Sequence, residues 1–108
     1  MLIVRGVNVF PTQIEEQILR DPRLSGNYQI HLARDGHLDQ VEVRCELQRG
    51  LSGRLSAAEV QQVSRELQHH IKTVIGISTQ VVVLEADALP RTLTGKAKRV
   101  FDTRPKQI

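Results

Sequence analysis

One lysine near the end of the chain has the setting of a residue that could act in a site. The stretch from Leu89 to Val100 reads LPRTLTGKAKRV and places Lys96 directly after a glycine. Pro90 restricts the direction of the chain before this segment, and Gly95 permits a tight turn. A long cationic stem on such a loop can extend into a site that other residues build. The alternative, an ordinary surface lysine, would be favoured if this loop stood alone.

Three common kinds of site are excluded by spacing or register. A phosphate-binding P-loop needs a glycine five residues before its Gly-Lys pair and a Ser or Thr after it, but Pro90 and Ala97 occupy those places. His69 and His70 are adjacent on a helix, so they point to different sides and cannot share a zinc ion. Cys45 lies in the apolar register of a strand, which favours an inert buried thiol over a nucleophile. No metal ligands are predicted.

The charge of the chain is concentrated at its C-terminal end. The net charge is only +3, but one acid, Asp102, faces six basic residues between positions 91 and 106: Arg91, Lys96, Lys98, Arg99, Arg104 and Lys106. Such a segment would attract a polyanion or form a solvated tail. The few aromatic residues do not resemble the pattern with which RNA-recognition sheets stack bases, so we expect no nucleic-acid partner.

The N-terminal part of the chain predicts a strand and then a helix. Residues 1–10 are rich in β-branched side chains, interrupted by an Arg-Gly pair that indicates a bulge or tight bend. Pro11 suits a first helical turn, Thr12 and Glu15 predict a capping box, and Pro22 ends the helix. One face of this helix carries its apolar residues, Ile14, Ile18 and Leu19.

The remainder predicts a hairpin, a second helix and a last strand. Two runs with a period of two flank a primed turn at Asp35-Gly36. The runs are Tyr28, Ile30 and Leu32, then Val41, Val43, Cys45 and Leu47. Ser56 and Glu59 predict a capping box for a helix that ends at Gly76. Its apolar stripe is Val60, Val63, Leu67, Ile71 and Val74. The unbroken apolar run in residues 79–84 predicts a strand buried on both faces.

The order strand-helix-strand-strand-helix-strand predicts a ferredoxin-like α+β sandwich with both helices on one face of a small sheet. With 40% hydrophobic and 25% charged residues, the 108 residues suit one soluble domain spanning 1–108. No apolar run is long enough to cross a membrane and no signal peptide is indicated, so we expect a cytoplasmic protein. Exposed sheet edges could pair two copies into a homodimer.

Two segments near opposite ends of the chain carry a resemblance to a known family. IVRGVNVFPTQIE, Ile3 to Glu15, resembles the opening of the C-terminal domain of phenylacetate-CoA ligases and their relatives in the acyl-adenylate-forming superfamily. PRTLTGKAKRV resembles the lysine loop that closes that domain. The wider superfamily has a basic residue in place of Asn8 and a glutamate in place of Gln13, and both residues here match the phenylacetate type. The family's hinge residue would lie just upstream of Met1, so the chain resembles a fragment cut at the hinge.

The resemblance implies a reaction in two steps. Members of the superfamily join a carboxylic acid to ATP, forming an acyl-adenylate and pyrophosphate, and then let the thiol of coenzyme A displace AMP. A large N-terminal domain binds ATP, Mg²⁺ and the acid, here phenylacetate or another aryl acid, and a small C-terminal domain serves as a movable lid. The chain resembles the lid alone. We therefore expect that N-terminal domain as its partner, and we expect the isolated chain to be catalytically inert and to bind no cofactor by itself.

The resemblance also implies roles for residues. Lys96 would be the adenylation lysine, placed between the carboxylate oxygen and the α-phosphate, where a fixed cation offsets charge. Three further residues of its loop are expected in cofactor binding, Arg91, Thr94 and Gly95. After the lid rotates, the other motif would line the path of the pantetheine arm of coenzyme A, with the residues Arg5, Gly6, Val7, Asn8 and Val9. Gly6 suits this task because backbone without a Cβ can approach a narrow channel closely.

Two other readings stay open from the sequence. Ferredoxin-like domains also occur as free-standing regulatory modules that pair through edges and bind small ligands, which would explain the fold but leave the lysine loop without a task. A second alternative keeps the superfamily and changes the acceptor, since relatives that adenylylate a deazaflavin have a similar C-terminal domain. The lid sequence does not decide between acceptors, because selectivity resides mainly in the other domain.

Overall fold

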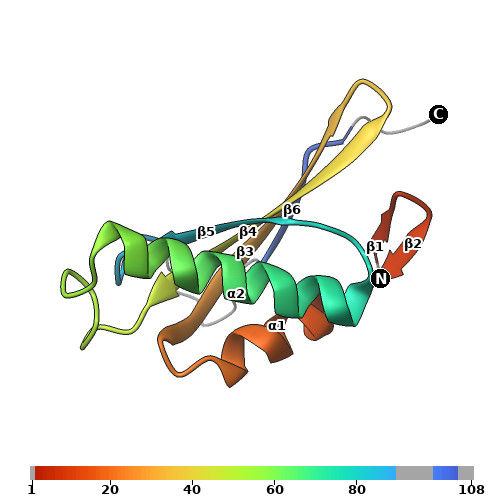
Figure 1. Cartoon of the computed structure of the whole chain (residues 1–108). Coiled ribbons are helices and arrows are strands. Elements are labelled where there is room, and N and C mark those ends of the chain that lie inside the picture. Colours follow the sequence, from red (N-terminus) through yellow and green to blue (C-terminus); the bar gives the residue numbers. More distant parts are fainter. Residues whose placement is uncertain (1, 90–98, 105–108) are drawn as a thin grey trace.

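A computed structural model of the chain describes residues 2–89 and 99–104. Within these ranges the chain forms two helices, a separate two-stranded hairpin and a four-stranded sheet (Figure 1). The elements are β1 (Leu2–Val4), β2 (Val7–Val9), α1 (Pro11–Arg20), β3 (Leu24–Asp35), β4 (Leu38–Leu47), α2 (Ala57–Ile75), β5 (Gln80–Leu84) and β6 (Val100–Asp102). The predicted α+β class is confirmed. No helix of the described residues is both long and apolar enough to span a membrane.

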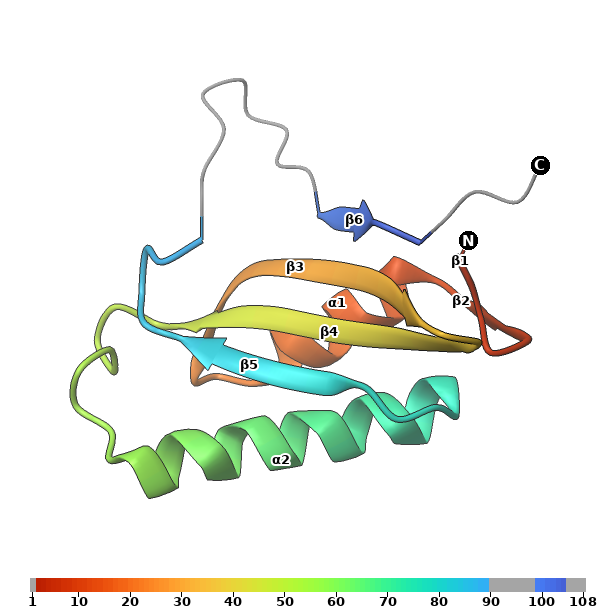
Figure 2. The same ribbon diagram turned by 90° about the horizontal axis from the view of Figure 1, so that it is seen from above.

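The four-stranded sheet has the order β5-β4-β3-β6. β3 and β4 form an antiparallel hairpin, while β5 is parallel to β4 and β6 is parallel to β3. Gly36, with φ of 62°, is the first residue of the two-residue connection between β3 and β4, as a primed turn requires. Both helices cover one face of this sheet, α1 beside β3 and α2 beside β5 (Figures 1 and 2). The predicted hairpin and two-helix layer are therefore confirmed.

The core lies between this face and the helices. Side chains alternate along the strands, so every second residue of β3 and β4 points toward the helices. The fully buried members of this set include Ile30, Leu32, Val43 and Cys45, and they meet Ile14, Ile18, Leu67 and Ile71 of the helices. Full burial of each such aliphatic side chain contributes about 1.5–3 kcal/mol. Burial also raises the pKa of the Cys45 thiol to about 12, which confirms the prediction of an inert cysteine.

The capping box predicted for α1 is wrong in its residues. The helix begins at Pro11, so Phe10 is the N-cap and its backbone N–H donates to Gln13 Oε1 at 3.2 Å. Thr12 already lies inside the helix, where its hydroxyl cannot serve as the cap. Pro11 fixes this start because its ring suits the first helical position. Gln13, and not the predicted pair Thr12 and Glu15, therefore caps the start of α1.

The second helix follows its predicted signals closely. Ser56 N–H donates to Glu59 Oε1 at 3.1 Å and Glu59 N–H donates to Ser56 Oγ at 3.2 Å, while Gly76 ends the helix with φ of 84°. Two positions of the predicted apolar stripes are wrong, because Leu19 of α1 is 63% exposed and Val74 of α2 is 43% exposed. In each helix the neighbouring residue, Ile18 beside Leu19 and Ile75 beside Val74, faces the core instead.

Two strand predictions are wrong, and one strand was not predicted. Residues 1–10 do not supply a strand of the main sheet but fold back on themselves as the hairpin of β1 and β2, with Leu2 paired to Val9. β5 is partly exposed and not buried on both faces, because it lies at the edge of the sheet. β6 was not predicted, since three residues are too few to show an alternating pattern.

Candidate functional site

The tip of the β1–β2 hairpin is a tight turn at Arg5 and Gly6. Both residues have positive φ, 50° and 76°, and they connect the paired residues Val4 and Val7. Two central residues with positive φ are the feature of a type I′ turn. A Cβ added at Gly6 would meet no atom within 4 Å, so the glycine is required here by its backbone conformation and its open side faces free space. This tip can therefore be approached closely by another molecule.

The hairpin has a buried side and an exposed side. Val4 and Val9 are almost completely buried and belong to the core, whereas Asn8 is exposed and Val7 is partly buried. Ile3, paired with Asn8, is 57% exposed. The core thus holds the hairpin by its two buried valines. Of the five predicted residues, the structure brings Arg5, Gly6 and Asn8 to the surface, with Val7 beside them, and places Val9 inside.

A cluster of arginines around one aspartate ties this hairpin to the rest of the domain. The Arg5 backbone N–H donates to Asp39 Oδ2 at 3.3 Å, and Arg5 Nε donates to the Asp39 carbonyl at 2.8 Å. Arg34 Nε donates to Asp39 Oδ1 at 2.8 Å. Arg104 Nη1 donates both to Asp39 Oδ2 at 3.1 Å and to the Ile3 carbonyl at 2.6 Å. Asp39 of β4 therefore joins the turn, the β3–β4 hairpin and the segment after β6.

The charges in this cluster do not cancel. Three guanidinium groups face two carboxylates, because Asp102 also accepts from Arg104 Nη2 at 2.9 Å. The hydrogen bond from the Arg34 side chain, followed by that from the Arg5 backbone, holds the pKa of Asp39 below its ordinary value. The Arg104 side chain does the same for the pKa of Asp102. The surroundings of the hairpin tip are consequently positive and would favour an anionic ligand nearby.

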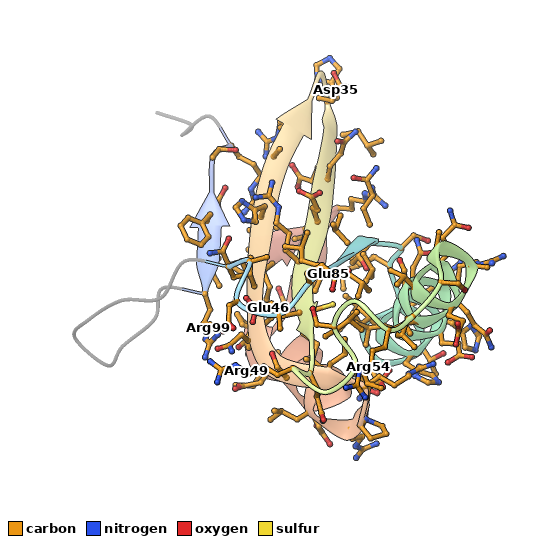
Figure 3. All side chains as sticks on the ribbon, turned by 90° about the vertical axis from the view of Figure 1, so that its left-hand side faces the viewer. Asp35, Glu46, Arg49, Arg54, Glu85 and Arg99 are labelled. Carbon is orange, nitrogen blue, oxygen red and sulfur yellow. The ribbon has the colours of Figure 1, made fainter. Side chains whose placement is uncertain are left out.

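At the other end of β4, a buried carboxylate holds the chain that leads into the lysine segment. Glu46 is fully buried, and its Oε2 accepts the backbone N–H of Leu89 at 2.6 Å. Ser25 Oγ donates to Glu46 Oε1 at 3.4 Å. Leu89 itself is 6% exposed. Figure 3 shows Glu46 well away from the β3–β4 turn, which the label of Asp35 marks.

The stretch between β5 and Leu89 is fixed by further contacts with the loop before α2. Glu85 accepts from the hydroxyl of Ser52 and, at 2.8 Å, from the backbone N–H of Gly53. Ser52 Oγ in turn accepts from the Ala86 N–H at 2.9 Å. Arg49 Nη2 lies 3.1 Å from Asp87 Oδ1, and Figure 3 shows Arg49 and Glu85 at this same end of the sheet.

The four predicted residues of the lysine segment, Lys96, Arg91, Thr94 and Gly95, lie outside the described residues. The segment is followed by Arg99, whose carbonyl accepts the Ile30 N–H at 2.7 Å as β6 joins β3. The Arg99 guanidinium also stacks 4.7 Å from the centre of the Tyr28 ring. Leu89 on one side and Arg99 on the other are thus both bonded to the sheet.

Sequence reasoning missed three residues of this arrangement, Asp39, Glu46 and Arg104. Asp39 lies just before the apolar run that begins at Val41, and Glu46 lies in the polar register of β4, where an acid reads as a solvated residue. Their low exposure, 9% and 0%, is the property that distinguishes them. No sequence signal indicates the role of Arg104, because its partners Ile3 and Asp39 are distant in the chain.

The chain from residue 6 to residue 104 matches the family described as AMP-binding enzyme C-terminal domain. The chain belongs to this family. The phenylacetate-coenzyme A ligase of Aromatoleum evansii is 45% identical over 99% of the chain, which is 24% of that protein. The ligase of Pseudomonas putida with the same name is 53% identical over 96% of the chain and 23% of that protein. The chain therefore spans about a quarter of the length of these relatives, and the predicted resemblance to a C-terminal domain of phenylacetate-CoA ligase type is confirmed.

Solved structures give the same result for the fold. A crystal structure of a domain of phenylacetate-coenzyme A ligase from Bacteroides vulgatus has a TM-score of 0.88 and 30% identity, covering 99% of the chain and 95% of that domain. The 2-hydroxyisobutyryl-CoA ligase, solved with its acyl-adenylate and CoA in the thioesterification state, has a TM-score of 0.85 and 27% identity over 96% of the chain and 21% of that protein. The Bacteroides structure is thus of a single domain of about the same length as this chain. These relatives do not favour the regulatory or deazaflavin alternatives.

Proposed function

We propose that this domain, spanning residues 1–108, is the movable C-terminal part of an AMP-forming acid–CoA ligase. The longer enzyme joins phenylacetate or another aryl acid to ATP, releasing pyrophosphate, and then transfers the acyl group from AMP to the thiol of coenzyme A. The observation that carries this proposal is the similarity of nearly the whole chain to several phenylacetate-coenzyme A ligases. One mobile domain then presents two different segments to a single active site, one for each step.

Lys96 serves the first step. Attack of a carboxylate on the α-phosphate of ATP brings two anions together, and a fixed ammonium between them offsets the charge that develops. Arg91, Thr94 and Gly95 belong to the same segment and contribute to nucleotide binding. Support comes from the two ends of the segment, because Leu89 and Arg99 are both hydrogen-bonded to groups of the sheet.

The β1–β2 hairpin serves the second step. Arg5, Gly6, Val7 and Asn8 line the path of the pantetheine arm, and Val9 holds the hairpin in the core. The exposed type I′ tip supports this role, since backbone at Gly6 can approach a thin chain without a side chain in between. The net positive charge beside the tip suits coenzyme A, which carries phosphates.

The N-terminal part of the longer enzyme is the partner of this domain. It supplies the pocket for the acid, the ATP-binding residues and the Mg²⁺ that accompanies ATP, so the domain alone does not catalyse either step. We place the enzyme in the cytoplasm, where its small soluble substrates occur. Pairing of two copies through an exposed sheet edge stays a prediction, with β5 and β6 as the edges that the described residues offer.

A chimeric ligase tests this function. The 108-residue chain replaces the matching segment of the Pseudomonas putida ligase, which is 53% identical to it. Pyrophosphate release and thioester formation are measured with ATP, phenylacetate and coenzyme A. The truncated enzyme that lacks the segment and a chimera with Lys96→Ala are the controls. We expect activity from the unmodified chimera only, and a chimera no more active than the truncated enzyme would contradict the proposal.

A further inference from the structure

Two buried carboxylates of β4, Asp39 and Glu46, make the same kind of bond to two different segments. Asp39 accepts the backbone N–H of Arg5, in the tip of the β1–β2 hairpin. Glu46 accepts the backbone N–H of Leu89, directly before the lysine segment. The proposed function gives each of these segments one step of the reaction, so each carboxylate holds one of them.

The two residues occupy opposite ends of one strand. They are seven positions apart, which in a strand corresponds to about 23 Å. An odd separation also places their side chains on opposite faces of the sheet. β4 is one of the two central strands of the sheet: it pairs with β3 along its length, Asp39 included, and with β5 from Glu42 to Glu46. A central strand fixes the distance between two groups better than a loop does.

Stability alone does not explain these two acids. Burying a carboxyl group costs free energy, which its hydrogen-bond partners have to offset. A valine at position 39 would continue the apolar row of Val41, Val43 and Cys45 on the same face of β4 without that cost. Each carboxylate instead has an environment that satisfies it: Arg34 and Arg104 at Asp39, and Ser25 at Glu46. Buried polar groups of this kind can specify one conformation of a segment.

We propose that Asp39 and Glu46 are positioning residues, Asp39 for the hairpin that serves thioester formation and Glu46 for the segment that serves adenylation. The proposal rests on the proposed function. Neither carboxylate contacts the reacting atoms. Each fixes a backbone amide, and through it the place of a functional segment relative to the rigid sheet. Misplacement of a reacting group by 1 Å can cost roughly a hundredfold in rate, so loss of one anchor should slow one step about tenfold or more.

The test compares the two half-reactions in the chimeric ligase. Adenylation is followed by pyrophosphate release, and thioester formation by supplying preformed phenylacetyl-adenylate and coenzyme A. We expect Asp39→Ala to slow thioester formation and to leave adenylation within about twofold, and Glu46→Ala to do the reverse. The control is Glu42→Ala, since Glu42 is a third carboxylate of β4 and bonds Arg44 of the same strand at 3.0 Å. This variant should leave both steps unchanged.

A second measurement does not need activity. Amide hydrogen exchange is followed by NMR in the 108-residue chain. Asp39→Ala should speed exchange at the Arg5 amide and not at Leu89, and Glu46→Ala should do the opposite. Asp39→Asn and Glu46→Gln keep an acceptor oxygen, so they should restore part of the protection, and they replace the alanine variants where those fail to fold.

The outcomes are distinct. An inactive unmodified chimera would refute the proposed function, and amide exchange would still decide whether the carboxylates hold the two segments. Equal loss of both half-reactions in both variants would overturn the assignment of one anchor to one step. Unchanged protection of the Arg5 and Leu89 amides in the variants would overturn the anchors themselves.

Discussion

The two ends of β4 hold their functional segments by different chemistry. At Asp39 the anchor is a cluster of three arginines and two carboxylates around an exposed turn, and at Glu46 it is a fully buried side chain bonded to an amide and a hydroxyl. Salt screens exposed charges far more than buried groups. The hairpin end, where Arg5 is exposed, should therefore respond to salt. One rigid strand thus supports two attachments that are built from different partners.

The largest effect in this comparison is expected from Lys96→Ala. Loss of a preorganised charge that stabilises a developing anion costs about 10²–10³ in rate. In the chimeric ligase the variant should lose adenylation by this factor and keep thioester formation from preformed acyl-adenylate. Lys98→Ala, two residues along the same segment, is the matched control and should keep both. If Lys96→Ala impaired both half-reactions alike, the two ends would not divide the steps between them.

The hairpin end should show the opposite loss in Gly6→Val. The substitution forces a β-branched residue into positive φ and places a side chain at the exposed tip, so thioester formation should fall about tenfold or more while adenylation persists. Gly36→Val is a close control, because Gly36 also has positive φ and free space around its Cβ position. Both variants should lose about 1–3 kcal/mol of stability by thermal unfolding. Normal acyl transfer by Gly6→Val would remove the hairpin from the second step.

The contrast between the two ends also explains what the sequence could and could not predict. α2 was predicted with its cap residues Ser56, Glu59 and Gly76 because every signal lies within the helix itself. The β3–β4 hairpin was predicted because alternation and a turn are likewise local. For residues 2–9 the sequence predicts one strand of the sheet, because no local signal distinguishes a bent strand that pairs with itself from one that pairs with the sheet.

The candidate site divides in the same way. The motifs around Gly6 and Lys96 could be found from residue types, whereas the anchors could not. Asp39 and Glu46 gain their meaning from donors at Arg5 and Leu89, which are 34 and 43 residues away. Only folding brings such partners together, and a polar residue in a strand resembles a solvated position until its burial is known.

Acid should loosen the hairpin end before the sheet unfolds. An aspartate titrates near pH 3.9 in an unfolded chain, and the pKa of Asp39 is lower than this in the folded domain. Ionised Asp39 therefore stabilises folding above about pH 4, and this contribution is lost as the pH falls through the folded pKa. We expect exchange at the Arg5 amide to rise over that range, and Asp39→Asn to abolish this rise.

Glu59→Gln is the control. The Ser56 backbone also lowers the pKa of Glu59, but this residue lies at the start of α2. An Arg5 amide that ignored Asp39→Asn would contradict a charge-based anchor.

The smallest expected effect is a change in the rate at which a reagent labels Cys45, the residue next to Glu46. The thiol is fully buried, with its Sγ 3.6 Å from the Val82 carbonyl, and burial raises its pKa to about 12. A thiol reagent at pH 8 should therefore label it only when the core around it opens, and rapidly after unfolding in denaturant. Glu46→Ala should raise the labelling rate of the native domain a few-fold, because it releases the chain next to this end of β4. Asp39→Ala should leave the rate unchanged, since its anchor lies at the other end of the strand. Equal acceleration by both variants would mean that β4 opens as one unit, and the two attachments could then not be independent.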